Sequence, residues 1–212
     1  MQNKNRYDGQ MISVDICLFS IINSKLCVLL AKRAEQPYID NWSLVGGKVY
    51  NDESCENAVV RELKEKANIT DINPILCGVF SDPKRDIRFR NISVSYLCLT
   101  NHLSYSANPK KISQIQWFEI DNIPNLAFDH NSILQNAYKQ LKNKVYDIEF
   151  VRNFLPQTFT LPQLQTIYEN ILQTKIDKRN FRRKLNSLSC LQDTLTKNQL
   201  DTHKKSAIYK FK

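Results

Sequence analysis

The stretch GKVYNDESCENAVVRELKEKANI, from Gly47 to Ile69, decides the fold class of this 212-residue chain. Valine, leucine and alanine recur in it at helical spacing, which predicts a helix from about Ser54 to Ala67. Two acids three residues apart, Glu62 and Glu65, would lie on one face of that helix. The stretch therefore predicts a helix that presents carboxylates to a neighbouring site.

Two glycines precede the helix and indicate the kind of ligand that its acids face. Gly46 and Gly47 predict a loop whose backbone N–H groups approach a phosphate closely, because glycine has no side chain. Lys48 follows directly and adds a positive charge. We therefore expect an anion pocket between this glycine pair and the helix.

The segment from Asn41 to Ile69 resembles the signature of the Nudix hydrolases. That signature is a glycine, five residues, a glutamate, seven residues, and then Arg-Glu-aliphatic-x-Glu-Glu-x-Gly-aliphatic. The residues in register are Gly47, Glu53, Arg61, Glu62, Leu63, Glu65 and Ile69, with Trp42 and Gly46 ahead of them. The resemblance implies an α+β fold, the Nudix α/β/α sandwich with a mixed sheet, whose helix acids hold Mg²⁺ against a pyrophosphate.

Two positions depart from the signature. Lys66 stands where the signature has its second adjacent glutamate, and Asn68 replaces the glycine but suits the left-handed end of a helix. An ammonium one turn after Glu62 can pair with it and repel a divalent cation, since like charges ~4 Å apart repel by roughly 4 kcal/mol near a surface. We expect no catalytic residue: Glu62 and Glu65 are vestigial acids that bind Mg²⁺ weakly at most.

An alternative interpretation keeps the site active. If Lys66 points to solvent, Glu53 or Asp86 could complete a magnesium site, and the chain would be an Mg²⁺-dependent hydrolase of ADP-ribose or a similar nucleoside diphosphate derivative. Otherwise no cofactor is required, and Mg²⁺ matters only for residual hydrolysis.

Further candidate ligand contacts come from a strand end and from a polar loop. Arg33 closes the strand-like run LCVLLAKR, although an arginine in such a place is more often solvated. The loop SDPKRD, residues 81–86, lies between two strand-like runs. The full predicted ligand-binding set is Arg33, Gly46, Gly47, Lys48, Glu62, Glu65, Lys66, Arg85 and Asp86.

The excess of basic residues is confined to the last third of the chain. Residues 151–212 hold 12 Lys and Arg against four Asp and Glu, so they carry +8 of the net charge of +9. A basic excess confined to one region indicates a polyanionic partner. We place a Nudix-like effector-binding domain at 1–148 and a second domain at 149–212.

The second domain has the element order of a winged helix-turn-helix. FTLPQLQTIYENIL predicts a helix in which Thr160 and Gln163 form a capping box. DKRNFRRKLNSL predicts a second helix with Asp177 as its N-cap, and LQDTLTKN and SAIYKF predict two short strands around a basic loop.

The second of these helices has the features of a DNA-reading helix. Phe181 and Leu185, four residues apart, would anchor it to the domain, while its cations face outward. Arginine suits guanine edges and phosphates, and asparagine suits adenine. The predicted DNA contacts are Thr160, Lys178, Arg179, Asn180, Arg182, Arg183, and in the wing Lys204 and Lys205.

Nearly the whole chain resembles the Nudix-related transcriptional regulators, best known as repressors of NAD biosynthesis and salvage genes. The resemblance rests on VDICLF, WSLVGG, the Glu65-Lys66 pair, LAFDH, FTLPQLQ, DKRNFRRKL and AIYKF. It implies a homodimer that binds a palindromic double-stranded operator and senses ADP-ribose or a related NAD metabolite. A sister branch responds to sugars such as arabinose, and this alternative stays open.

Three further expectations concern LAFDH, the cysteines and the compartment. LAFDH, residues 126–130, is expected near the interdomain contact, with His130 as either a signalling residue or a plain helix start. The six scattered cysteines are expected to be reduced thiols. The chain lacks an apolar run of roughly 18 residues and begins with a polar segment, so we expect a cytoplasmic protein without membrane contact.

Overall fold

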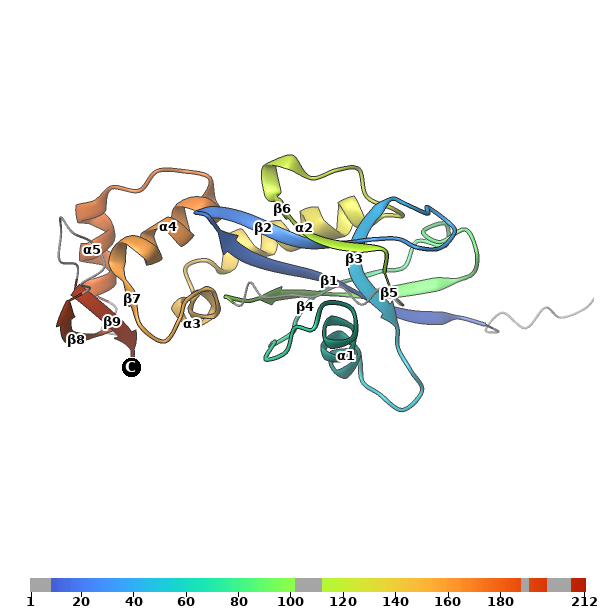
Figure 1. Ribbon diagram of the computed structural model, residues 1–212, viewed down its shortest axis with the longest axis horizontal. Helices are drawn as coiled ribbons and strands as arrows, with labels where there is room; N and C mark the ends of the chain where they lie inside the picture. Colours follow the sequence, from blue (N-terminus) through green and yellow to red (C-terminus); the bar gives the residue numbers. More distant parts are fainter. Residues whose placement is uncertain (1–8, 102–111, 188–190, 198–206) are drawn as a thin grey trace, which may run out of the picture.

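The computed structural model describes residues 9–101, 112–187, 191–197 and 207–212. Figure 1 shows an elongated molecule with a large sheet and its helices at one end and a small three-stranded sheet with two helices at the other. The two ends correspond to the Nudix-like and winged-helix parts expected from the sequence.

The large sheet has six strands in the order β4-β5-β1-β3-β2-β6. Its strands are β1 (Met11–Ile22), β2 (Lys25–Lys32), β3 (Trp42–Lys48), β4 (Ile75–Phe80), β5 (Asn91–Leu99) and β6 (Gln114–Glu119). β1 runs parallel to β5, and the other pairings are antiparallel, so the sheet is mixed. The sequence predicted five of these strands.

One helix covers each face of the sheet, which makes the expected α/β/α sandwich (Figure 1). Side chains alternate between the faces of a strand. In β1, Ile16 and Leu18 pack with α1 (Cys55–Ala67) in one apolar cluster. Their neighbours Cys17 and Phe19 belong to the opposite cluster, which contains the buried side chains of α2 (His130–Lys144).

The ends of α1 follow from local chemistry. The Ser54 hydroxyl accepts a hydrogen bond from the Asn57 N–H and caps the first turn. Asn68 ends the helix in the left-handed conformation, with φ 55° and ψ 37°, as its amino-acid type predicted. Both boundaries thus agree with the sequence analysis.

Strand β3 corrects one prediction. Gly46 and Gly47 lie within this strand and not in a loop. Glycine is required here for space: a Cβ on Gly46 would lie 2.2 Å from the Val14 carbonyl oxygen, and one on Gly47 would lie 2.0 Å from Glu62 Oε1. The glycine pair therefore lets β3 approach both β1 and helix α1, and it does not form a turn.

A short connection leads into the winged-helix end. It comprises α3 (Ile148–Val151) and the 3₁₀ turn η2 (Arg152–Phe154), while another such turn, η1 (Ile120–Asn122), follows β6. The winged helix has α4 (Leu161–Leu172), α5 (Lys178–Ser187), and a sheet of β7 (Phe159–Thr160), β9 (Ala207–Phe211) and β8 (Leu191–Lys197) in that order. The capping box at Thr160 and the Asp177 cap of α5 are present as predicted.

The two ends share one apolar core. Leu141 of α2, Phe154, Leu164 of α4 and Phe181 of α5 belong to a single buried cluster. The Tyr138 hydroxyl donates a hydrogen bond to the Ile171 carbonyl oxygen, 3.1 Å away. Helix α2 therefore joins the large sheet directly to the winged helix.

The structure bears on the state of the cysteines and on the predicted lack of a membrane span. The cysteines at 17, 27, 55, 77 and 98 are free thiols, and Cys190 lies outside the described residues. Among the described residues, every helix is too short or too polar to cross a membrane.

Candidate functional site

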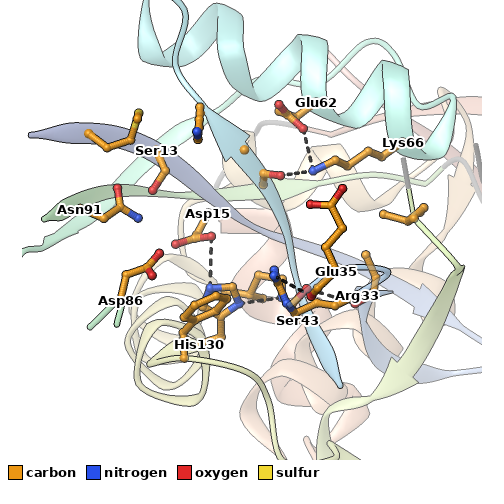
Figure 2. Close-up of a pocket in the computed structure, with 18 of the residues that line it drawn as sticks. Ser13, Asp15, Arg33, Glu35, Ser43, Glu62, Lys66, Asp86, Asn91 and His130 are labelled. Atoms are coloured by element: carbon orange, nitrogen blue, oxygen red, sulfur yellow. Dashed lines mark hydrogen bonds and ion pairs between the residues drawn. The ribbon is translucent and has the colours of Figure 1, made fainter. Parts of the chain in front are cut away.

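A cavity of about 470 Å³ opens between β3, the N-terminal end of α2, the C-terminal half of α1 and the loop before β5. Its walls carry six Lys and Arg side chains and four Asp and Glu side chains, so its lining has an excess of positive charge. Figure 2 shows Glu62 and Lys66 on the α1 side of this cavity and Asp15 and His130 on the opposite side. The two sides have different chemistry.

On the α1 side, the Glu62 carboxylate is held by two cations. Arg61 Nη1 donates to its Oε1 at 2.6 Å, and Lys66 Nζ lies 2.9 Å from its Oε2. Lys66 also donates a hydrogen bond to the Gly46 carbonyl oxygen in β3. The predicted pairing of Lys66 with Glu62 is therefore confirmed.

The acids that could have completed a magnesium site are occupied elsewhere. Arg61 donates two hydrogen bonds to Glu53, at 2.6 and 2.9 Å, which raise the pKa of the guanidinium and lower that of the carboxyl group. Asp86 receives a bidentate pair from Arg88 at 2.8 and 3.0 Å. Both acids are thus engaged by arginines, and Lys66, which that alternative placed in solvent, pairs with Glu62 instead.

The donors present do not fit the divalent ion that the Nudix fold implies. Mg²⁺ needs several free oxygen ligands in near-octahedral order. Glu62 is neutralised by Arg61 and Lys66, and Glu65 lies 3.7 Å from Arg61 and does not line the cavity. Among the described residues, no three His, Cys, Asp or Glu side chains converge as a metal site.

The floor of the cavity is a buried charge cluster around Arg85. Its guanidinium donates to Asp129 at 2.8 and 2.9 Å and to Asp15 at 3.1 Å. Ser93 donates a further hydrogen bond of 2.6 Å to Asp15. Burial alone would lower the pKa of Arg85, but the two carboxylates outweigh it and the net direction is upward. Asp15, Arg85 and Asp129 are thus fixed by one another.

His130 connects this cluster to the sheet. Its Nδ1 accepts a hydrogen bond from the Leu44 N–H at 3.0 Å, so the ring proton is on Nε2, 3.3 Å from Asp15 Oδ1. Burial lowers the pKa of the imidazole, although Asp15 and Asp129 partly oppose the shift. His130 is therefore a neutral, oriented residue of the cavity floor.

An aromatic group with two arginines forms another part of the wall. The guanidinium carbons of Arg33 and Arg88 lie 4.8 and 5.5 Å from the centre of the Phe128 ring. Phe128 has φ +56°, a strained conformation for a bulky residue, which persists only where surrounding contacts hold it. Burial and the nearby Arg88 charge lower the pKa of Arg33. An anion between these arginines would relieve that repulsion.

Most of the predicted ligand-binding residues meet at this cavity. Those that line it are Arg33, Gly46, Gly47, Lys48, Glu62, Lys66, Arg85 and Asp86, whereas Glu65 does not. Sequence reasoning missed Asp15, Phe128 and Asp129. The segment LAFDH was noted but assigned to the interdomain contact, and this was wrong, because Phe128 and His130 line the cavity instead. A polar Asp15 within the apolar run of β1 was the available signal.

Helix α5 presents a second candidate site at the other end of the molecule. Phe181 and Leu185 are buried, while Lys178, Arg179, Asn180, Arg182, Arg183 and Lys184 are exposed. The Arg183 guanidinium donates to Asn180, and the Lys184 ammonium lies 4.3 Å from the centre of the Tyr146 ring. In the described residues, Lys178, Arg179 and Arg182 have no hydrogen bond or ion pair within the chain.

Three residues of the predicted DNA-binding set lie outside helix α5. Thr160 is buried and its hydroxyl serves the capping box, so the structure gives it a helix-capping role in place of an exposed, DNA-facing one. Lys204 and Lys205 lie outside the described residues.

Comparison with known families matches residues 11–141 to the NUDIX domain and residues 151–211 to the NrtR DNA-binding winged helix domain. The chain is 32% identical over 197 residues to the ADPR responsive transcriptional repressor NtrR of Acinetobacter baylyi, covering 90% of this chain and 78% of that protein.

Solved structures extend this similarity. The structure of Shewanella oneidensis NrtR complexed with a 27mer DNA has a TM-score of 0.76 and 30% identity, covering 95% of this chain and 93% of that one. The NUDIX domain of the same Shewanella protein, complexed with ADP ribose, has a TM-score of 0.59 and 27% identity, covering 66% and 94%.

The fold and the two matched regions define a Nudix-type domain joined to a DNA-binding winged helix. The chain belongs to the NrtR family.

Proposed function

We propose that this chain is a DNA-binding transcriptional repressor that responds to ADP-ribose. One observation carries the proposal: the cavity acid Glu62 is paired with Lys66, in a chain whose basic helix α5 is exposed at the other end. The cavity thus suits an anionic ligand better than a metal-dependent reaction. A relative named as an ADPR responsive repressor and a similar domain complexed with ADP ribose support the choice of effector.

The walls of the cavity suggest how ADP-ribose lies in it. Its pyrophosphate is placed against Gly47, Lys48 and Lys66, where two cations face the cavity. Its adenine is placed at Phe128 and Arg33, because flat rings stack on aromatic and guanidinium groups. The cavity volume of about 470 Å³ lies within the ordinary range for sites of small ligands.

The DNA contacts are assigned to the exposed face of α5. Lys178, Arg179 and Arg182 are unpaired within the described residues and are therefore available to phosphates and guanine edges. Asn180 and Arg183 contribute to the same face. Residues 149–212 in this assignment bind DNA, and residues 1–148 bind the effector. A structure of a related protein complexed with DNA supports it.

Helix α2 provides a physical connection between the two sites. Its first residue, His130, lines the cavity, and its Tyr138 donates a hydrogen bond to Ile171 of α4. Tyr146, just after α2, contacts Lys184 of α5. A ligand that shifts the N-terminal end of α2 would therefore move α5. Ordinary coupling of this kind is worth about 1–3 kcal/mol.

We further propose that the protein is a homodimer on a palindromic operator, that it controls NAD biosynthesis or salvage genes, and that it is cytoplasmic. Two copies related by a twofold axis read two equivalent half-sites. The edge strand β4 exposes Leu76 and Val79, 58% and 60% accessible, which offers an apolar surface for a second copy. Because ADP-ribose is a product of NAD breakdown, a repressor that senses it would adjust NAD supply.

The test is fluorescence anisotropy of labelled DNA from upstream of the chain's own gene, titrated with protein in the presence and absence of ADP-ribose. We expect sequence-specific binding that ADP-ribose weakens roughly 5- to 150-fold. Binding that is indifferent to ADP-ribose would contradict the effector and point to the sugar-sensing alternative. Absence of specific binding would contradict the repressor itself.

A further inference from the structure

The ammonium of Lys66 lies where oxygen donors from two different elements converge. Glu62 Oε2 belongs to α1 and lies 2.9 Å from Lys66 Nζ, and the Gly46 carbonyl oxygen belongs to β3 and accepts a hydrogen bond from the same nitrogen. Dashed lines in Figure 2 mark both contacts. A carboxylate and a carbonyl are the hard oxygen donors that divalent cations prefer.

The ammonium keeps bonding capacity for a ligand. A lysine side chain has three N–H donors. The Gly46 carbonyl oxygen accepts one of them, and Glu62 lies 2.9 Å away as an ion-pair partner. Because Lys66 lines the cavity, at least one N–H donor is available to a bound anion. The Lys66 and Glu62 side chains are only 18% and 7% exposed, so solvent screens this charge little.

The surrounding backbone leaves the ammonium little freedom. A Cβ on Gly47 would lie 2.0 Å from Glu62 Oε1, so β3 and the Glu62 carboxylate are already in close contact. Arg61 holds the same carboxylate at 2.6 Å from its other side. Glu62 therefore cannot turn away from Lys66 without losing its hydrogen bond to Arg61. The Lys66 ammonium is held between β3 and α1.

We propose that Lys66 is a built-in cation that takes the place of a divalent metal ion in this pocket. The tethered ammonium occupies the oxygen donors, excludes Mg²⁺, and holds the pyrophosphate of the effector directly. Ligand binding is then independent of metal, and the occupancy of the pocket depends on the concentration of effector and not on that of Mg²⁺. The part of this inference that concerns pyrophosphate depends on the proposed function, whereas the exclusion of metal does not.

The first experiment uses the metal alone on the full chain. Thermal unfolding is followed with and without millimolar Mg²⁺ or Mn²⁺ for the natural chain, Lys66→Glu, and the control Lys64→Glu. Lys64 is exposed on the same helix, so its variant has the same charge change away from the site. We expect metal to stabilise Lys66→Glu only. Equal stabilisation of the natural chain, or no response of a folded Lys66→Glu variant, would overturn the exclusion of metal by Lys66.

The second experiment measures ADP-ribose binding by calorimetry with EDTA or with Mg²⁺. The natural chain should bind equally in both conditions. Lys66→Gln, whose polar side chain is one atom shorter and uncharged, should bind roughly 10- to 100-fold more weakly in both, because a charge-assisted hydrogen bond is lost. Binding by the natural chain that requires Mg²⁺, or undiminished binding by Lys66→Gln, would overturn the proposed role. A natural chain that binds no ADP-ribose in either condition would contradict the effector, while the metal experiment still tests Lys66.

Discussion

The cavity and helix α5 are both rich in basic side chains, yet they hold their charges in opposite ways. In the cavity, Lys66, Arg85 and Arg88 each pair with a carboxylate within 3.1 Å. On α5, Lys178 and Arg179 are exposed and have no such partner among the described residues. A buried charge is costly unless it is paired, whereas an exposed charge is cheap to leave free.

The difference indicates two modes of recognising phosphate. A small ligand in the cavity meets side chains that neighbours already hold in place, so little ordering is needed on binding. A DNA duplex bound at α5, as proposed, would meet exposed, solvated cations and gain from the release of its counterions. We expect substitutions in the cavity to act on folding and on effector binding, and substitutions on α5 to act on DNA affinity and its salt dependence.

The largest effect should follow from Arg85→Met. The Arg85 side chain is 3% exposed, and its loss leaves the buried Asp15 and the partly buried Asp129 without their cation. Breaking a buried pair from one side costs about 3–5 kcal/mol of unfolding free energy. Denaturant unfolding should show this loss, while Arg90→Met, at an exposed hydrogen bond to Ser81, should change stability by less than about 0.5 kcal/mol. Similar losses of unfolding free energy for the two variants would contradict the claim that the buried ion pairs of Arg85 stabilise the fold.

Gly47→Ala comes next, because it tests how tightly strand and helix meet. The added Cβ would lie 2.0 Å from Glu62 Oε1, so the carboxylate must move away from Arg61 and Lys66. Overpacking of this kind costs about 1–3 kcal/mol. The matched control is Gly78→Ala, whose Cβ would meet the end of the flexible Asn136 side chain at 3.2 Å. If chemical denaturation finds both variants equally stable, the close contact does not constrain the site.

Arg182→Ala should affect DNA binding but not folding. The side chain is exposed and unpaired within the described residues, so unfolding free energy should change by less than about 0.5 kcal/mol. Affinity for specific DNA should fall by about 1–3 kcal/mol, or the salt slope should decrease by about one if the contact is to phosphate. Lys139→Ala, exposed on α2, is the control. Equal anisotropy curves for the two variants would contradict the assignment of α5.

The smallest of the expected effects is the change that His130→Gln makes in the pH dependence of stability, separate from any pH-independent loss of its hydrogen bond to Leu44. Burial lowers the pKa of His130, so below about pH 6.5 the unfolded chain binds a proton that the folded chain does not. The contribution is complete above pH 6.5 and is lost as the pH falls towards the lowered folded-state pKa. Unfolding free energies measured between pH 7 and pH 5 should therefore decline less steeply for the variant. Parallel profiles would show that His130 titrates alike in both states.

Local signals made much of this structure predictable. Helix α1 begins at its Ser54 cap and ends at Asn68, and α4 has the Thr160–Gln163 capping box, because these features depend on neighbours three or four residues away. The spacing of the Nudix signature likewise predicted that Lys66 pairs with Glu62, one helical turn apart. Local spacing is sufficient where the partners belong to one element.

Strand pairing explains the predictions that failed. Gly46 and Gly47 look like a loop from composition, but β3 is formed by hydrogen bonds to β1 and β2, from residues far away in the sequence. LAFDH was placed at the interdomain contact because the direction of α2 cannot be read from its sequence. Its N-terminal end lies at the cavity, and its C-terminal half meets the winged helix.

The amino-acid sequence by itself determined the two-part architecture, the pairing of Lys66 with Glu62, and the anchored basic helix α5, since each depends on spacing within one element or on composition. Only the tertiary structure decided the cavity floor, where Asp15 of β1, Arg85 of a loop and His130 of α2 meet. It also decided that Glu53 pairs with Arg61, eight residues away in the sequence. These contacts join residues from separate elements, and chain packing, not local preference, sets their distances.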